Sequence, residues 1–170
     1  MKLWLISVPI GLLCSAMPAS GQHVRGGFMA GPSQPVSEAR LDTGLGGEGW
    51  VGVEFPDMSL MPRAVVGIER FSGKQQSRLD MKSARIDVLG ILRDVPLQPF
   101  GFAGIGVADT EYSSSSDELP FGAGDAGMIY GGGIGARQDV GPVQVTAEAR
   151  YFIISDADLN EIQLRLGVGF

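Results

Sequence analysis

Two residue types that build many active sites and cross-links are almost missing from this chain. Its 170 residues contain one cysteine and one histidine. A disulfide within the chain needs two cysteines, and a thiolate zinc site needs several, so neither is expected. Catalysis by an activated nucleophile usually requires a neighbouring base. His23 is the only histidine available for that task, and we therefore predict no enzymatic activity.

Basic residues are also scarce. The chain has 13 lysines and arginines against 19 acidic residues, which gives a formal net charge of −6. Proteins that bind nucleic acid usually carry a basic patch or stripe. The acidic balance therefore argues against a nucleic-acid partner.

Long apolar runs are missing as well. The extended apolar segment Leu3–Leu13 is shorter than the roughly 20 residues that a membrane-spanning helix needs. It follows Lys2 and precedes small residues that end near Ala19, which is typical of a cleaved secretory signal. We expect residues 1–21 to be the signal peptide and residues 22–170 to form one mature domain.

The chain is rich instead in glycine and in short stretches that alternate apolar with polar residues. The chain has 26 glycines. The last stretch is the clearest, with one face formed by Ile162, Leu164, Leu166, Val168 and Phe170. Alternation with period two is typical of β-strands that have one apolar face. Seven further stretches fit a strand: 23–30, 50–55, 66–69, 84–88, 99–108, 127–137 and 143–151.

The strand count and the links between strands predict a closed barrel. Short links at 56–62, 94–98 and 138–142 alternate with links at 31–47, 73–80, 109–125 and 155–160, of which the last is brief. An even number of strands with this alternation predicts an all-β fold, an eight-stranded antiparallel up-and-down transmembrane β-barrel. A soluble β-sandwich or a lipocalin-like barrel would also alternate. The strand charges are sparse, mixed in sign and interspersed with glycine, which favours a narrow lumen.

Three segments resemble the outer-membrane β-barrel domain family that includes OmpA-type and OmpX-type proteins. They are Pro99–Gly106 (PFGFAGIG), Tyr130–Tyr151 (YGGGIGARQDVGPVQVTAEARY) and Ile162–Phe170 (IQLRLGVGF). The resemblance implies an eight-stranded barrel in the outer membrane, in contact with lipid and lipopolysaccharide, and no cofactor. It also implies insertion by the outer-membrane assembly machinery, which would recognise Phe170 and the apolar face of the last strand. No peptidoglycan-binding domain, as in the OmpA type, is expected.

Parity along the strands predicts which charges face inward. A barrel of eight strands encloses a lumen just wide enough for side chains to fill, so a nutrient pore is not expected. Buried charges persist when they are paired and hydrogen-bonded. We therefore predict a salt-bridge network that plugs the lumen, and the alternative is a narrow, gated ion path through it. The predicted members are Glu54, Glu69, Arg85, Asp87, Glu148, Arg150 and Arg165, with Arg137 as a further candidate.

The third long loop gathers carboxylates that could attract Ca²⁺ or Mg²⁺, which prefer oxygen ligands. Their spacing is not that of an EF-hand, so a solvated acidic loop is favoured and no metal site is predicted. Loops on a rigid scaffold often carry function. A surface adhesin that binds an unidentified extracellular ligand is therefore the main functional alternative. The acidic residues of this loop are Asp109, Glu111, Asp117, Glu118 and Asp125.

Overall fold

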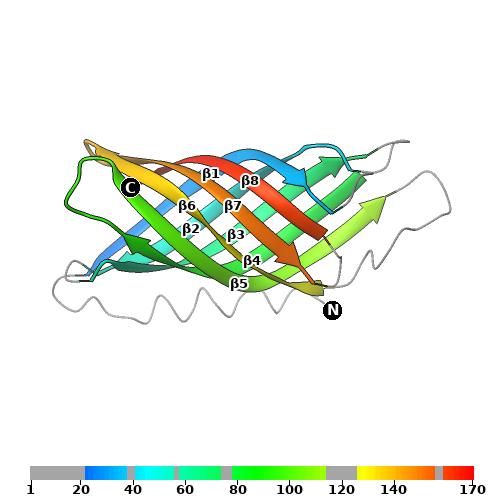
Figure 1. Cartoon of the computed structure of the whole chain (residues 1–170), viewed down its shortest axis with the longest axis horizontal. Coiled ribbons are helices and arrows are strands. Elements are labelled where there is room, and N and C mark those ends of the chain that lie inside the picture. The colour runs from blue at the N-terminus through cyan, green and yellow to red at the C-terminus, as the bar shows by residue number, and fades with distance from the viewer. Residues whose placement is uncertain (1–21, 38–40, 56–57, 74–77, 114–125, 156–158) are drawn as a thin grey trace.

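Eight antiparallel strands close into a barrel in the computed structural model (Figure 1). Each strand pairs with its neighbours in the chain, and the first strand pairs with the last along a seam that includes Gly27 and Gly169. The predicted fold is therefore confirmed. The strands are β1 (His23–Pro35), β2 (Gly44–Glu54), β3 (Leu60–Ser72), β4 (Arg78–Ile91), β5 (Gln98–Ser113), β6 (Ala126–Val140), β7 (Val143–Ile154) and β8 (Leu159–Gly169).

The structure describes six parts of the chain. The predicted signal peptide lies outside them, and so do Asp117, Glu118 and Asp125 of the acidic loop. No helix in the described parts is long and apolar enough to cross a membrane. The described residues are 22–37, 41–55, 58–73, 78–113, 126–155 and 159–170.

Most strands are longer than the alternation of apolar residues predicts. β1 continues to Pro35 and β5 to Ser113, both inside segments that were predicted as loops. The backbone ladder accounts for the difference, because its hydrogen bonds continue where the outward side chains are polar. Lys82 and Asp109, for example, are paired positions on β4 and β5. At the opposite end of the barrel, β6 and β7 are joined by a tight turn in which Gly141 has a φ of 64°, a conformation that favours glycine.

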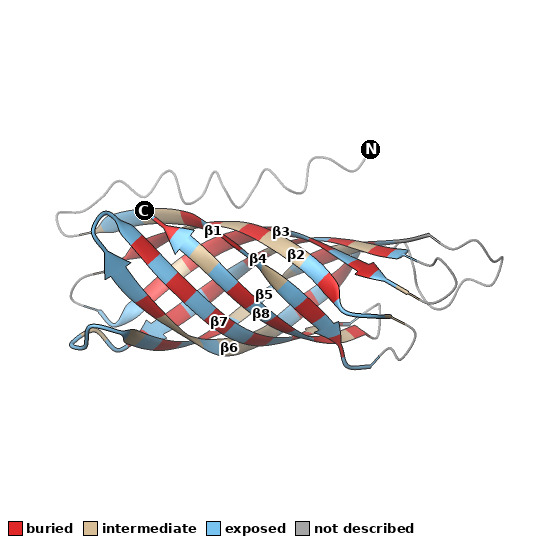
Figure 2. Ribbon diagram, turned by 90° about the horizontal axis from the view of Figure 1, so that it is seen from above, coloured by how far each residue is buried: buried red, intermediate tan, exposed pale blue. Residues whose placement is uncertain are grey.

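Burial alternates along most of the strand length, with interruptions in β2 and β6 (Figure 2). The outer face is mainly apolar, and large residues such as Phe28, Ile134 and Leu166 are exposed on it. Two tyrosines, Tyr130 and Tyr151, stand on the same face. Barrels in membranes carry an outward apolar band of this kind with aromatic residues near its borders. The five residues of the predicted assembly signal also face outward: Ile162, Leu164, Leu166, Val168 and Phe170. Their recognition by assembly machinery stays a prediction.

We expect Leu166→Arg to destabilise the barrel in lipid vesicles by about 2 to 4 kcal/mol, the cost of an arginine at the bilayer midplane. Leu166 is 71% exposed, at the centre of the apolar face of β8. Asn160→Arg, on the same face but near the start of that strand, should cost about 0 to 1 kcal/mol. Urea unfolding in vesicles measures both values. Equal costs for the two variants would contradict the assignment of this face to lipid.

Candidate functional site: a ring of charges in the lumen

Six charged side chains form a closed ring across the middle of the lumen. They are three arginines and three carboxylates, and their side chains are at most 3% exposed. Each arginine contacts two carboxylates, and each carboxylate contacts two arginines. We call this set the charge ring: Arg63, Glu148, Arg150, Glu48, Arg85 and Asp87, in order around the cycle.

The contacts of Arg63 show the geometry of the ring. Its Nη1 and Nη2 donate to the two carboxylate oxygens of Glu148 at 2.7 and 3.0 Å, and its Nε donates to Asp87 Oδ2 at 3.0 Å. A bidentate arginine–carboxylate pair of this kind is among the stronger and more directional hydrogen-bonded pairs in proteins. Because Glu148 is on β7 while Arg63 is on β3, the pair joins strands that are not neighbours in the sheet.

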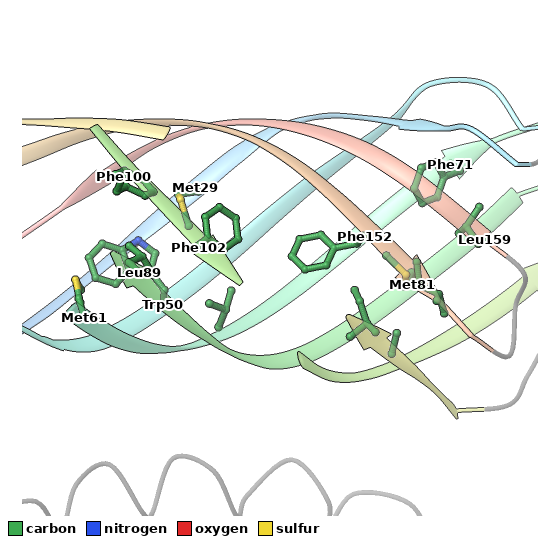
Figure 3. Packing of buried hydrophobic residues seen from close by; sticks show 14 of the residues in the cluster. Met29, Trp50, Met61, Phe71, Met81, Leu89, Phe100, Phe102, Phe152 and Leu159 are labelled. Atoms are coloured by element: carbon green, nitrogen blue, oxygen red, sulfur yellow. The ribbon is translucent and has the colours of Figure 1, made fainter. Parts of the chain in front are cut away.

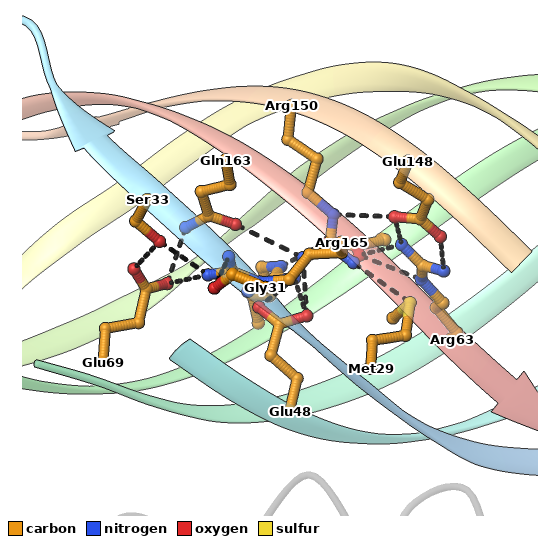
Figure 4. Close-up of polar contacts among 12 residues, drawn as sticks. Met29, Gly31, Ser33, Glu48, Arg63, Glu69, Glu148, Arg150, Gln163 and Arg165 are labelled. Atoms are coloured by element: carbon orange, nitrogen blue, oxygen red, sulfur yellow. Dashed lines mark hydrogen bonds and ion pairs between the residues drawn. The ribbon is translucent and has the colours of Figure 1, made fainter. Parts of the chain in front are cut away.

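The other two arginines complete the cycle (Figure 4). Arg150 Nε donates to Glu148 Oε2 at 2.7 Å, and its Nη1 donates to Glu48 Oε2 at 2.5 Å. Arg85 Nη2 donates to the same Glu48 oxygen at 3.0 Å, and its Nε donates to Asp87 Oδ1 at 3.1 Å. Three positive and three negative charges therefore balance within the ring.

Aromatic rings support the arginines from the faces that the carboxylates leave free. The guanidinium carbon of Arg63 lies 5.1 Å from the centre of the Phe102 ring, and that of Arg150 lies 5.7 Å from it. Arg85 lies 4.7 Å from the centre of the Phe152 ring. Cation–π contacts at these distances are stabilising, and more so where water is excluded.

Apolar side chains fill the lumen on both sides of the charge ring (Figure 3). Towards the end with the long loops, the buried cluster includes Phe71, Met81 and Leu159. Towards the other end it includes Trp50 and Phe100. All of these side chains are buried. The charge ring is therefore shielded from solvent by protein along the axis of the barrel.

The seven charges that were predicted to face inward are all buried, but the structure divides them into three groups. Four of them belong to the charge ring. Glu69 and Arg165 form an ion pair at 2.9 Å, nearer the end of the barrel with the long loops, which we call the outer end. Glu54 lies at the opposite end, which we call the inner end. Gln163 links the outer pair to the ring, because it accepts from Arg150 and donates to Glu69. The four predicted residues that belong to the charge ring are Arg85, Asp87, Glu148 and Arg150.

The inner group contains Arg137, the further candidate for the lumenal network. Although it lies close to the turn between β6 and β7, it is buried, 3% exposed, and donates to Glu54 Oε1 at 2.6 Å. Arg25 and Arg93 contact the same carboxylate at 2.8 and 3.3 Å. The guanidinium of Arg137 points back into the lumen, where Glu54 satisfies it.

Three buried charges were not predicted from the sequence: Glu48, Arg63 and Glu161. Each shares the parity of a charge that was assigned to the lumen on the same strand. Glu48 has the parity of Glu54, and Arg63 has the parity of Glu69. They were missed because the predicted strands began at the first clear apolar alternation, so these residues fell at or beyond the predicted strand ends.

The remaining candidates that lie within the described residues do not form a second site. His23 begins β1 and is exposed. Asp109 and Glu111 stand on the outer face of β5, where Glu111 pairs with Lys82 at 3.2 Å. In the described parts of the chain, no group of three or more histidine, cysteine, aspartate or glutamate side chains could hold a metal ion.

Comparison with known proteins shows the fold. No protein-family model and no curated protein sequence matches the chain. Among solved structures, Neisserial surface protein A (NspA) is similar, with 16% identity, a TM-score of 0.68, and coverage of 88% of this chain and 97% of that one. The attachment invasion locus protein Ail of Yersinia pestis is also similar, with 13% identity, a TM-score of 0.60, and coverage of 89% and 100%. The chain therefore has the fold of small outer-membrane β-barrels.

Replacing Arg150 with methionine should destabilise the barrel by about 3 to 5 kcal/mol, the usual cost of removing one partner of a buried ion pair. Methionine keeps most of the volume, but it leaves Glu48 and Glu148 each short of one arginine. Arg78→Met is the matched control, because Arg78 pairs with Asp80 on the exposed outer face. That control should cost about 0 to 1 kcal/mol. Similar unfolding midpoints for both variants would contradict the ring.

The space for the charge ring depends on Gly104, which faces the lumen from β5. A Cβ at this position would lie 2.1 Å from Asp87 Oδ1, well inside contact distance. We expect Gly104→Ala to destabilise the barrel by about 1 to 3 kcal/mol through overpacking. Gly101→Ala on the same strand is the control, since its Cβ would be 3.8 Å from the nearest atom. A loss of stability in Gly101→Ala as large as that in Gly104→Ala would show that backbone effects dominate.

Proposed function

We propose that this chain is a non-enzymatic outer-membrane barrel whose lumen is closed by the charge ring, with a structural or surface-interaction role. The charge ring, enclosed between two apolar layers, carries this proposal. It crosses the lumen with side chains that are paired to one another, which suits a rigid scaffold and does not suit a pore.

The outer face supports a location in the membrane. Large apolar side chains are exposed around the barrel, and the closed ladder satisfies the backbone of the paired strands internally. Only helices and closed barrels meet that requirement in lipid. Export by residues 1–21 and insertion through the C-terminal strand belong to the same proposal, as do contacts with membrane lipid and lipopolysaccharide.

The packing of the lumen supports a closed barrel. A cavity beside Trp50 and Arg137 has a volume of about 10 Å³, roughly the space of one water molecule. The ring side chains on either side of the axis are in direct contact with one another. An ion path would require these pairs to separate, which removes favourable contacts from charges that have little water to replace them.

The position of His23 supports a non-enzymatic role. It lies at the start of β1, at the end of the barrel opposite the long loops. A nucleophile facing the outer leaflet, at the end with the long loops, would need its base at that same end, far from His23. The members of the charge ring are paired with one another and are not exposed to a substrate.

A role in surface attachment is the second candidate. β4 and β5 continue past the apolar face and carry outward-facing charges, among them Arg78 and Lys82. One similar structure is that of Ail in complex with the heparin analogue sucrose octasulfate, at 15% identity, a TM-score of 0.55 and coverage of 88% of this chain and 97% of that one. By analogy, the outer end of this barrel is the surface that would contact another molecule.

Planar-bilayer recording tests the closed lumen. The mature protein should show no steady conductance, because the charge ring and the apolar layers fill the lumen. Arg63→Ala, which frees Glu148 and Asp87 from a shared partner, should show small, flickering openings. Arg78→Ala on the outer face should remain silent. Large and stable conductance of the unmodified protein would reject the proposal and favour a channel.

A further inference from the structure

The outer end of the lumen holds two carboxylates against one arginine. Glu69 on β3 accepts from Ser33 Oγ at 2.5 Å and from Gln163 Nε2 at 2.6 Å, and it forms an ion pair with Arg165 Nη2 at 2.9 Å. Glu161 on β8 accepts from the same Gln163 nitrogen at 2.7 Å. The two carboxylates are therefore adjacent, and they share one amide donor.

Of the two carboxylates, Glu161 is the one that the surrounding structure leaves incompletely satisfied. It is 0% exposed, and its Oε2 is buried without a hydrogen-bond partner. Its paired positions on the neighbouring strands are Pro35 on β1 and Phe152 on β7, and neither can donate from its side chain. A buried acceptor with no donor costs free energy, and more so if it is ionised.

Within the described residues, no other positive charge beside the pair compensates for the second carboxylate. The paired positions of Glu69 are Gly46 on β2 and Met81 on β4. Arg150 on β7 reaches Gln163 at 3.3 Å, but its charge is used by Glu48 and Glu148. The charge ring balances three arginines with three carboxylates, whereas this group has only Arg165 for two.

We propose that Glu69 and Glu161 together bind one compact positive charge, a proton or an alkali cation, at the outer end of the lumen. Two neighbouring carboxylates in a dry site are not both ionised without a further positive charge. A proton on Glu161 Oε2 would turn the unpartnered acceptor into a donor to Glu69. An alkali cation would instead be held by carboxylate oxygens of both residues.

A single monovalent charge fits the site better than a divalent ion. Adding one positive charge to Arg165 balances the two carboxylates, as three arginines balance three carboxylates in the charge ring. A divalent ion would normally collect six or more oxygen ligands. The site offers two carboxylates, and Gln163 already uses its amide nitrogen on both. The outer group with its bound charge would then be neutral, and it would close the lumen beneath Phe71 and Leu159.

The test compares the unmodified protein with Glu161→Gln, because an amide has the shape of a neutral acid and can donate to Glu69. Urea unfolding is followed from mildly acidic to alkaline pH, in sodium chloride and in choline chloride at equal ionic strength. If a proton is bound, the folded state of the unmodified protein holds one proton more than the unfolded state. Its unfolding equilibrium constant should then rise by up to about tenfold per pH unit as pH increases.

If an alkali cation is bound instead, the unmodified protein should lose stability when the bulky choline ion replaces sodium. Glu161→Gln should remove either dependence. It should be more stable than the unmodified protein at alkaline pH if a proton is bound, or in choline chloride if an alkali cation is bound. Glu111→Gln is the control, because Glu111 is 62% exposed and pairs with Lys82 outside the lumen. It should keep the profile of the unmodified protein.

Two results would overturn the proposal. One is a response to pH and to the cation that is the same in Glu161→Gln as in the unmodified protein. The other is failure of Glu161→Gln to fold at any pH, since the proposal requires the outer group to be neutral overall and this variant leaves Glu69 balanced by Arg165. Infrared spectroscopy gives an independent reading of the proton arm, through a protonated carboxyl band that is present in the unmodified protein and absent in Glu161→Gln.

Discussion

Pairing between arginine and carboxylate in a dry lumen is the interaction on which the interior of this barrel depends. The charge ring is a cycle, so each member has two partners and none can be removed without leaving a charge uncompensated. It joins β2, β3, β4 and β7, and Figure 4 labels four of its members, Glu48, Arg63, Glu148 and Arg150. The exclusion of water strengthens each pair and makes complete pairing necessary.

The three groups of buried charges differ in how completely the protein itself can neutralise them. The charge ring is balanced. At the inner end, Glu54 contacts three arginines, and two of these, Arg25 and Arg93, have side chains that are 29% and 23% exposed, so water can share in their solvation. At the outer end, Glu69 and Glu161 are buried with one arginine, and water has little access. Position along the barrel axis therefore decides which group needs an additional charge.

The sequence was sufficient for the fold and for the direction of most side chains, because period-two alternation survives in all eight strands. It was insufficient for strand ends, since the ladder continues through residues where the apolar alternation is unclear, and this is why Glu48, Arg63 and Glu161 were missed. It was also insufficient for the pairing. Parity says that Arg63 faces inward, but its contact with Glu148, 85 residues away, depends on the register of every strand between them.

The seam between β1 and β8 has a consequence for how the chain folds. Arg165 bonds to Ser33, 132 residues earlier, so the contacts that complete the barrel have almost the largest sequence separation the domain allows. Folding slows as contacts become less local, because chain entropy is lost before those contacts form. Until β8 arrives, β1 presents an unpaired edge that could capture another strand. Chains released in water before the seam closes should therefore aggregate in proportion to the time that this edge stays open.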